Sequence, residues 1–203
     1  MSVSTARPRH VQLKTRRIPS AESAVMQPVP VGPSRQALAP GYRLRSFTID
    51  GVLGQGGFGI TYLAHDQARD LAVAIKEYLP SELAMRQTDS TVCPITENRR
   101  EDYAWGLRRF IAEGETLARF DHPNIVFVHE VFVTNGTAYM VMSYEKGVSF
   151  ADYLPAGGTL SERWLKRMLV AIVDGLHGVH EAGYIHRDIK PANIMIGDFG
   201  EVL

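Results

Sequence analysis

The spacing of hydrophobic residues predicts strands in the first two thirds of the chain. Apolar and polar residues alternate loosely over residues 42–54, which end in a glycine-containing stretch, so this segment is a strand candidate. Residues 60–66 and 71–79 are two further strand candidates, and a polar turn joins them. Residues 124–133 and 137–144 form another pair of candidates, separated by the hairpin sequence TNG. We therefore expect a group of antiparallel strands.

Helical spacing appears in three places. Residues 101–120 form the first helix candidate, and residues 149–154 form a short one. Ser161 is a helix-capping residue at the start of a long amphipathic segment that ends at Gly183. A strand-rich half thus precedes a helix-rich half, which indicates an α+β fold. The apolar positions of the first helix are Trp105, Leu107, Phe110, Ile111, Leu117 and Ala118.

Two segments lack a regular period. The polar, turn-rich residues 80–98 are expected to be a loop insertion on the surface. Residues 1–40 are rich in Pro, Ser, Val and Arg, and we expect them to form a disordered leader. Residues 1–41 carry six basic residues and one acid, whereas the rest carries 16 basic and 21 acidic residues. A basic tail can bind nucleic acid or acidic lipid, but a solvated leader is the simpler interpretation, so no nucleic-acid partner is expected.

The composition is that of a soluble globular protein, with 45% hydrophobic and 22% charged residues among 203. The single cysteine, Cys93, excludes an intrachain disulfide and fits a reducing compartment, so a cytoplasmic location is expected. No apolar run approaches the ~18 residues that a membrane-spanning helix needs.

A glycine-rich segment, LGQGGFGIT, follows the first strand candidate and carries G-x-G-x-x-G at Gly54, Gly56 and Gly59. In dinucleotide-binding folds a helix follows such glycines directly, whereas a strand-like sequence follows here. We expect a strand–turn–strand flap whose backbone N–H groups can face phosphate oxygens. An ordinary glycine-rich hairpin is the alternative.

A lysine and a glutamate are predicted to form an internal ion pair. Lys76 lies within an apolar strand candidate, so it should be partly buried and should need an anion. Glu113 is spaced to share the helix face of Phe110 and Leu117, whereas Glu115 should face water. Glu113 is therefore the expected partner of Lys76.

The segment HRDIKPAN, residues 186–193, has the spacing H-R-D-x-K-x-x-N. It follows the glycine-rich segment, VAIK, Glu113 and HPNIV, in the order in which protein kinases carry these motifs. Over residues 42–203 the chain resembles the eukaryotic-like serine/threonine protein kinases of bacteria. Lys190 is typical of the serine/threonine type.

The resemblance implies ATP and Mg²⁺ as cofactors and gives roles to five residues. Asp188 would accept the proton of the substrate hydroxyl, Lys190 would lie near the γ-phosphate, and Asn193 would bind Mg²⁺. Lys76, held by Glu113, would pair with the α- and β-phosphates.

The resemblance also implies an adenine pocket. Ala74 and Met195 would sandwich the ring, Met142 would guard the pocket, and the hinge backbone at 143–145 would hydrogen-bond adenine. The complete implied ATP-binding set is Leu53, Gly54, Gln55, Gly56, Gly57, Phe58, Gly59, Thr61, Ala74, Lys76, Met142, Ser143, Tyr144, Glu145 and Met195.

The resemblance divides the chain into a leader (1–40), a small lobe with its hinge (41–145) and part of a helical large lobe (146–203). Asp198-Phe199-Gly200 spells the metal-binding tripeptide of kinases, but Asp198 lies ten residues after Asp188, where about eighteen are usual. We interpret NIMI as a first strand, GDFG as a turn and EVL as a second strand. The large lobe is then expected to end before the metal-binding motif.

The expected function is transfer of the γ-phosphate of Mg-ATP to serine or threonine hydroxyls of proteins. The lone chain is expected to be weakly active or inactive, because a second metal ligand would be missing. The alternative is a non-catalytic half-kinase that binds a partner kinase. A Rossmann-type dinucleotide enzyme rests on the glycines alone and is disfavoured by VAIK and HRDIKPAN.

Overall fold

A computed structural model describes residues 36–154, 159–198 and 200–203. Most of the predicted leader lies outside these residues. Its last part is described, and there Leu38 is 3% exposed and belongs to the core. The folded part of the chain therefore begins before residue 41, which is the start that the sequence predicts.

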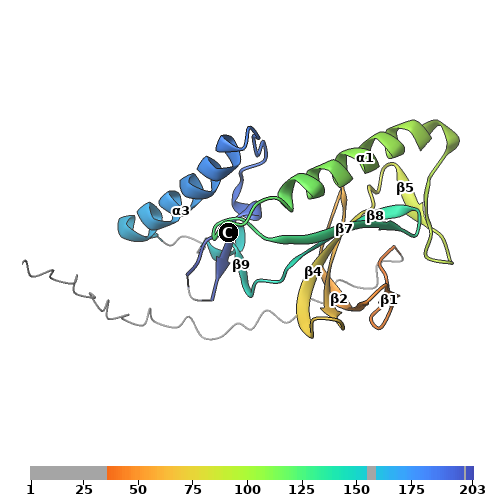
Figure 1. Cartoon of the computed structure of the whole chain (residues 1–203), viewed down its shortest axis with the longest axis horizontal. Helices are drawn as coiled ribbons and strands as arrows, with labels where there is room; N and C mark the ends of the chain where they lie inside the picture. The colour runs from red at the N-terminus through yellow and green to blue at the C-terminus, as the bar shows by residue number, and fades with distance from the viewer. Residues whose placement is uncertain (1–35, 155–158, 199) are drawn as a thin grey trace, which may run out of the picture.

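A six-stranded antiparallel sheet forms one end of the molecule (Figure 1). The order across the sheet is β1-β2-β3-β4-β8-β7. The predicted strands are confirmed with two differences. The candidate at residues 42–54 is divided into two paired strands, β1 and β2, and the candidate at residues 124–133 begins only at Val128. The strands are β1 (Arg43–Leu44), β2 (Phe47–Gly56), β3 (Gly59–Asp66), β4 (Leu71–Tyr78), β7 (Val128–Thr134) and β8 (Thr137–Ser143).

Helix α1 (Arg100–Leu117) covers one face of this sheet. The ring of Tyr78 packs against Tyr103 and Phe110, with ring centroids 5.4 and 5.6 Å apart. Gly114 is buried on the side of the helix that faces the sheet, and a Cβ there would overlap Val131 Cγ2. Trp105 is 60% exposed, so its prediction as an apolar-face residue is wrong.

The segment that the sequence predicts to be a surface loop contacts the opposite face of β4, where Arg86 pairs with Glu77. Residues 80–98 contain the strands β5 (Ala84–Arg86) and β6 (Val92–Pro94), which pair with each other, and lead into the 3₁₀ helix η1 (Glu97–Arg99). Ala84 and Val92 are 2% and 3% exposed and join the main core. The loop prediction is therefore wrong: two three-residue strands are too short to show a period, but their apolar residues close the core.

The second part of the chain is smaller and lies at the other end of the molecule (Figure 1). Ser161 caps the long helix by accepting a hydrogen bond from the N–H of Trp164, as predicted. This part has its own core, made of Phe150, Met168, Ile194, Ile196 and Val202. Its elements are β9 (Gly147–Ser149), α2 (Phe150–Tyr153), α3 (Glu162–Glu181), η2 (Pro191–Asn193) and β10 (Met195–Gly197).

The end of the chain is a hairpin, as the sequence predicts. Backbone hydrogen bonds run in both directions between Met195 and Leu203, and Ile196 is bridged to Val202. β10 also pairs with β9 on its other side. The predicted α+β architecture is confirmed, with strands first and helices later.

Candidate nucleotide and phosphotransfer site

The register of the sheet brings several predicted site residues to one face. Thr61 in β3 lies opposite Lys76 in β4, and Ala74 in β4 lies opposite Met142 in β8. Directly opposed residues of antiparallel strands share a face, as do residues two apart along a strand. Thr61, Ala74, Lys76 and Met142 therefore line the same face, with the side chain of Ala74 9% exposed at its centre.

The glycine-rich segment is the hairpin between β2 and β3, as expected. Gly54 pairs with Thr61 and Gly56 with Gly59, so Gly57 and Phe58 form the tip. A strand follows the glycines, which excludes the helix that a dinucleotide-binding fold would need. A Cβ on Gly59 would overlap the carbonyl oxygen of Glu77, so this glycine permits the hairpin to lie directly on β4.

Lys76 and Glu113 are not paired. Lys76 is half-buried, as predicted, with Nζ 5.9 Å from the centroid of the Phe110 ring. Glu113 is exposed, and within the described residues no ion pair of 4.0 Å or less joins it to Lys76. The prediction of an interior Glu113 is therefore wrong, because Gly114 is the residue that α1 turns towards the sheet. Glu115 is exposed, as predicted.

In the segment HRDIKPAN, two predicted site residues, Lys190 and Asn193, contact the carboxylate of a third, Asp188. The Oδ2 atom of Asp188 accepts from Asn193 Nδ2 at 2.8 Å and lies 2.9 Å from Lys190 Nζ. Pro191 opens the 3₁₀ turn η2, which returns Asn193 to Asp188. The hydrogen bonds from Lys190 and Asn193 lower the pKa of the exposed Asp188 carboxyl below its usual value.

Asn193 is arranged so that its amide oxygen is available for a cation. Its Nδ2 donates to both the backbone oxygen and Oδ2 of Asp188, at 2.9 and 2.8 Å. The described residues contain no group of three or more His, Cys, Asp or Glu side chains that could hold a metal. A Mg²⁺ ion held here would complete its shell with oxygens from water or from the phosphates of a nucleotide.

The hinge follows β8 and leads into β9. The N–H of Ser143 donates to the carbonyl of Phe127 at 2.9 Å, so this amide is already engaged. Ser143 Oγ also lies 3.1 Å from Nε2 of His129, a residue that sequence reasoning missed. Burial lowers the pKa of His129, which favours its neutral form.

The remaining residues of the implied ATP set differ in exposure. Met195 lies in β10 and pairs with Ser149 of β9, and Ser149 is a few residues beyond the hinge in the sequence. Leu53, Gly54, Gly59, Thr61, Met142, Ser143, Tyr144 and Met195 are half-buried, whereas Gln55, Gly56, Gly57, Phe58 and Glu145 are exposed.

Asp198 lies in the turn of the C-terminal hairpin. Its N–H donates to the carbonyl of Lys146 at 3.3 Å, and the N–H of Gly200 donates to the carbonyl of Gly197 at 2.9 Å. Phe199 is outside the described residues. The prediction that this stretch forms a hairpin turn is confirmed.

Comparison with known proteins identifies the family. Residues 47–202 match the family model described as "Protein kinase domain". The chain belongs to the protein kinase family. This agrees with the resemblance seen in its motifs and with the fold, in which an antiparallel small lobe with one main helix precedes an incomplete helical large lobe.

Its relatives include bacterial serine/threonine kinases. The chain is 35% identical over 150 residues to the probable serine/threonine-protein kinase pknA2 of Bifidobacterium longum (strain NCC 2705), a match that covers 74% of the chain and 18% of that protein. It is 32% identical over 154 residues to the serine/threonine-protein kinase PrkC of Bacillus subtilis (strain 168), covering 74% and 20%. The chain thus spans about a fifth of the length of these relatives.

Solved kinase structures have the same fold. A structure titled "PpkA-294 apo form" superimposes with a TM-score of 0.79 at 35% identity, over 83% of this kinase chain and 60% of that one. A crystal structure of the PknI kinase domain of Mycobacterium tuberculosis gives a TM-score of 0.60 at 24% identity, over 80% and 59%. At that identity the second comparison supports the fold alone.

Proposed function

We propose that this kinase chain binds Mg-ATP against the sheet face of Thr61, Ala74, Lys76 and Met142. We also propose that its Asp188 is the proton acceptor for transfer of the γ-phosphate to serine or threonine hydroxyls of proteins, a reaction that this chain alone supports poorly. The observation that carries the proposal is the grouping of Lys190 and Asn193 around Asp188. These residue types at this spacing are those of a protein-kinase catalytic loop.

The proposed roles follow from the chemistry of each group. Asp188 would take the proton of the attacking hydroxyl, which requires the carboxylate form that an aspartate has at neutral pH. Its lowered pKa extends that form to a lower pH. Lys190 would place a positive charge beside the transferred phosphoryl group. Bound Mg²⁺ would neutralise phosphate charge, and Asn193 would hold it through its amide oxygen.

The proposal is tested by measuring Mg-ATP binding to the 203-residue chain by calorimetry. We expect weak but measurable binding that Lys76→Met reduces about tenfold, because the proposed cation facing the phosphates is lost. Lys166→Met is the control, since Lys166 is exposed on α3 and paired with Glu162 at 2.6 Å. Absence of any nucleotide binding by the wild-type chain would overturn the proposal.

Phosphotransfer by this chain alone is proposed to be negligible. Asn193 is the metal ligand that we propose, and Asp198 is engaged in the hairpin turn, so charge on the transferred phosphoryl would be poorly neutralised. Incubation with γ-labelled ATP and a serine-containing peptide should give no labelled product. Robust autophosphorylation that Asp188→Asn abolishes would contradict this expectation.

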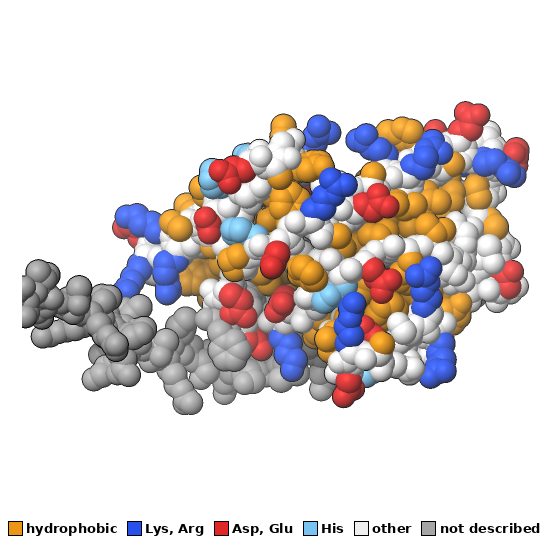
Figure 2. Space-filling model, in the orientation of Figure 1, with side chains coloured by type: hydrophobic (Ala, Val, Ile, Leu, Met, Phe, Trp, Pro, Cys, Tyr) orange, Lys and Arg blue, Asp and Glu red, His pale blue; other side chains and the backbone are white. Residues whose placement is uncertain are grey.

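A second candidate function is that of a half-kinase that binds a partner kinase. It is favoured by apolar side chains exposed on α3, where Leu169, Val170 and Val173 are 54%, 68% and 62% exposed. Figure 2 shows hydrophobic side chains at the surface at this end of the molecule. Sedimentation of the chain with a purified bacterial serine/threonine kinase should then show a complex that Val170→Lys with Val173→Lys abolishes.

A cytoplasmic location belongs to the same proposal, because ATP is the proposed substrate. In the described part of the chain no helix combines the length and apolarity needed to cross a membrane.

A further inference from the structure

A buried ion pair joins the residue next to Lys76 to the hairpin of β5 and β6. Glu77 and Arg86 have side chains that are 0% and 5% exposed, and Arg86 Nη2 contacts Glu77 Oε2. Tyr62 donates its hydroxyl hydrogen to the same oxygen at 2.7 Å. Burial and the charge of Glu77 raise the pKa of Tyr62, so Tyr62 remains a donor. Removing one partner of such a buried pair leaves an uncompensated charge.

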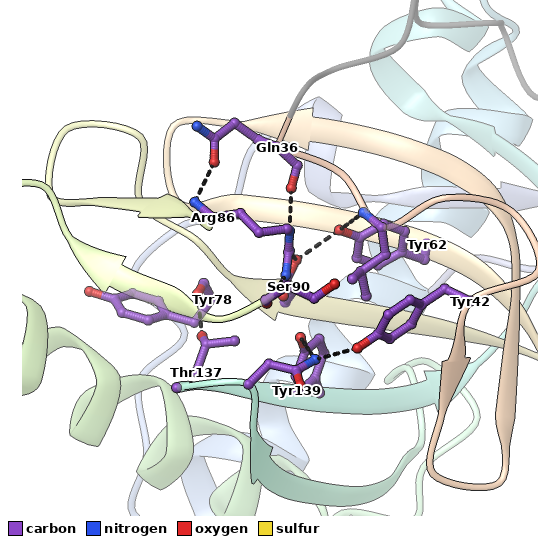
Figure 3. Close-up of polar contacts among 12 residues, drawn as sticks. Gln36, Tyr42, Tyr62, Tyr78, Arg86, Ser90, Thr137 and Tyr139 are labelled. Atoms are coloured by element: carbon purple, nitrogen blue, oxygen red, sulfur yellow. Dashed lines mark hydrogen bonds and ion pairs between the residues drawn. The ribbon is translucent and has the colours of Figure 1, made fainter. Parts of the chain in front are cut away.

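Arg86 also binds two other segments of the chain (Figure 3). Its backbone N–H donates to Gln36 Oε1 at 2.7 Å, and its Nε donates to the backbone oxygen of Gln36 at 2.7 Å. Its Nη1 donates to the carbonyl of Ser90 at 2.9 Å. One residue thereby fixes the start of the described chain, the turn between β5 and β6, and strand β4.

Both the strand and the insertion touch the glycine hairpin. Gly59 lies directly against the carbonyl of Glu77, as its lack of room for a Cβ shows. The N–H of Leu79 donates to the carbonyl of Phe58, and the N–H of Ser81 donates to the carbonyl of Gly57, each at 3.2 Å. The tip of the glycine hairpin is therefore held by the first residues after β4.

We infer that Arg86 is a positioning residue of the kinase site: through Glu77 it fixes the strand of Lys76, and the insertion so anchored holds the tip of the glycine hairpin at the phosphate end of the site. Glu77 alternates with Lys76 along β4, so it secures the strand from the face opposite the nucleotide. Arg86 itself touches no proposed ligand. The inference rests on the proposed nucleotide site.

The test compares two ligands on variants of the full 203-residue chain. Arg86→Met should weaken Mg-ATP binding about tenfold. A displacement of about 1 Å of the groups that position a ligand has a large effect on its interactions. Adenosine has no phosphates, so its affinity should change by less than about twofold. Arg100→Met is the matched control, since Arg100 pairs with Glu97 at 2.7 Å on the surface, with side chains 68% and 79% exposed. A merely structural role would reduce affinity for both ligands equally, and that result would overturn the inference.

A second pair of variants applies if Arg86→Met fails to fold. Ser81→Pro removes the N–H that binds Gly57, whereas Ser81→Ala retains it, and Ser81 is exposed. Ser81→Pro should speed hydrogen exchange of the amides at 56–58 at least about threefold and weaken Mg-ATP binding, and Ser81→Ala should do neither. Unchanged exchange in Ser81→Pro would overturn the inference. This readout needs no nucleotide, so it is independent of whether the proposed function holds.

Discussion

At the scale of single residues, Asp188 shows how a short sequence specifies a local geometry. Lys190 follows it by two residues and contacts its carboxylate, and the proline-initiated turn that begins at Pro191 brings Asn193 back to the same carboxylate. The contacts of the Asp188 carboxylate with Lys190 and Asn193 join residues within five positions of one another. The resemblance to protein kinases gave these three residues related roles, and the structure shows that they lie within contact distance of one another.

Lys190→Met should raise the pKa of Asp188 towards its usual value. In the wild type the pKa is lowered, chiefly by the hydrogen bond from Lys190, so the carboxylate stays ionised to a lower pH. Without that donor, protonation should begin at a higher pH. Carbon-13 NMR titration of the Asp188 carboxyl measures the change, and Lys166→Met should leave it unaltered. An identical titration in Lys190→Met would show that Lys190 does not control this carboxylate.

Glu113 illustrates the opposite case. Its spacing from Phe110 and Leu117 predicts the apolar face, yet it is exposed while Gly114 is buried. The periodic spacing of hydrophobic residues predicts how wide the buried side of a helix is, but it does not predict how the helix is rotated about its axis against the sheet. That rotation depends on where glycines let the helix approach the sheet, which involves residues from β7 and β8.

At the scale of elements, the glycine hairpin combines two glycines with different tasks. A Cβ added at Gly56 would have nothing within 4 Å, whereas one at Gly59 would meet the backbone of β4. The G-x-G-x-x-G spacing predicts the turn, but it cannot distinguish a glycine required by packing from one that leaves room for a ligand.

Gly59→Ala should destabilise the chain by about 1–3 kcal/mol, because the new methyl group can be accommodated only by moving backbone. Urea denaturation followed by circular dichroism measures this loss. Gly56→Ala is the control and should stay within about 0.5 kcal/mol of the wild type. Equal stability of the two variants would contradict the close contact with Glu77.

Helix α1 has its own test at Gly114. Gly114→Ala gains about 1 kcal/mol of helix propensity, but its methyl group would overlap Val131 and lie 2.9 Å from Met140 Cε. Overpacking of about 1–3 kcal/mol should prevail, so we expect net destabilisation in thermal unfolding. In α3, Gly178→Ala meets only His122 Cδ2 at 3.7 Å and should stabilise. Stabilisation by both substitutions would show that α1 is not seated as described.

At the scale of the whole molecule, the segment between α1 and β7 contacts the second part of the chain. Asn124 Nδ2 donates to the carbonyl of Val202 at 2.7 Å, across 78 residues. His122 Nε2 lies 3.6 Å from Asp174 Oδ2 on α3. This short segment therefore contacts both the long helix and the C-terminal hairpin.

Asn124→Ala should cost about 1 kcal/mol, the usual value of one hydrogen bond, and should speed hydrogen exchange at residues 195–203. Gln67→Ala is the control, because its hydrogen bonds with Arg43 and Thr48 are on the surface. Unchanged exchange in Asn124→Ala would mean that the C-terminal hairpin is held by its own core and by β9.

The sequence alone predicts the strands, the long helices and the turn at Asp198. Each depends on alternation, capping or turn chemistry among close neighbours, which a sequence displays directly. The folded arrangement was needed to show that Ala84 and Val92 join the core, that Glu113 faces outwards and that Arg86 pairs with Glu77. These depend on partners distant along the chain, because burying a charge or fixing the rotation of a helix requires the surface opposite it.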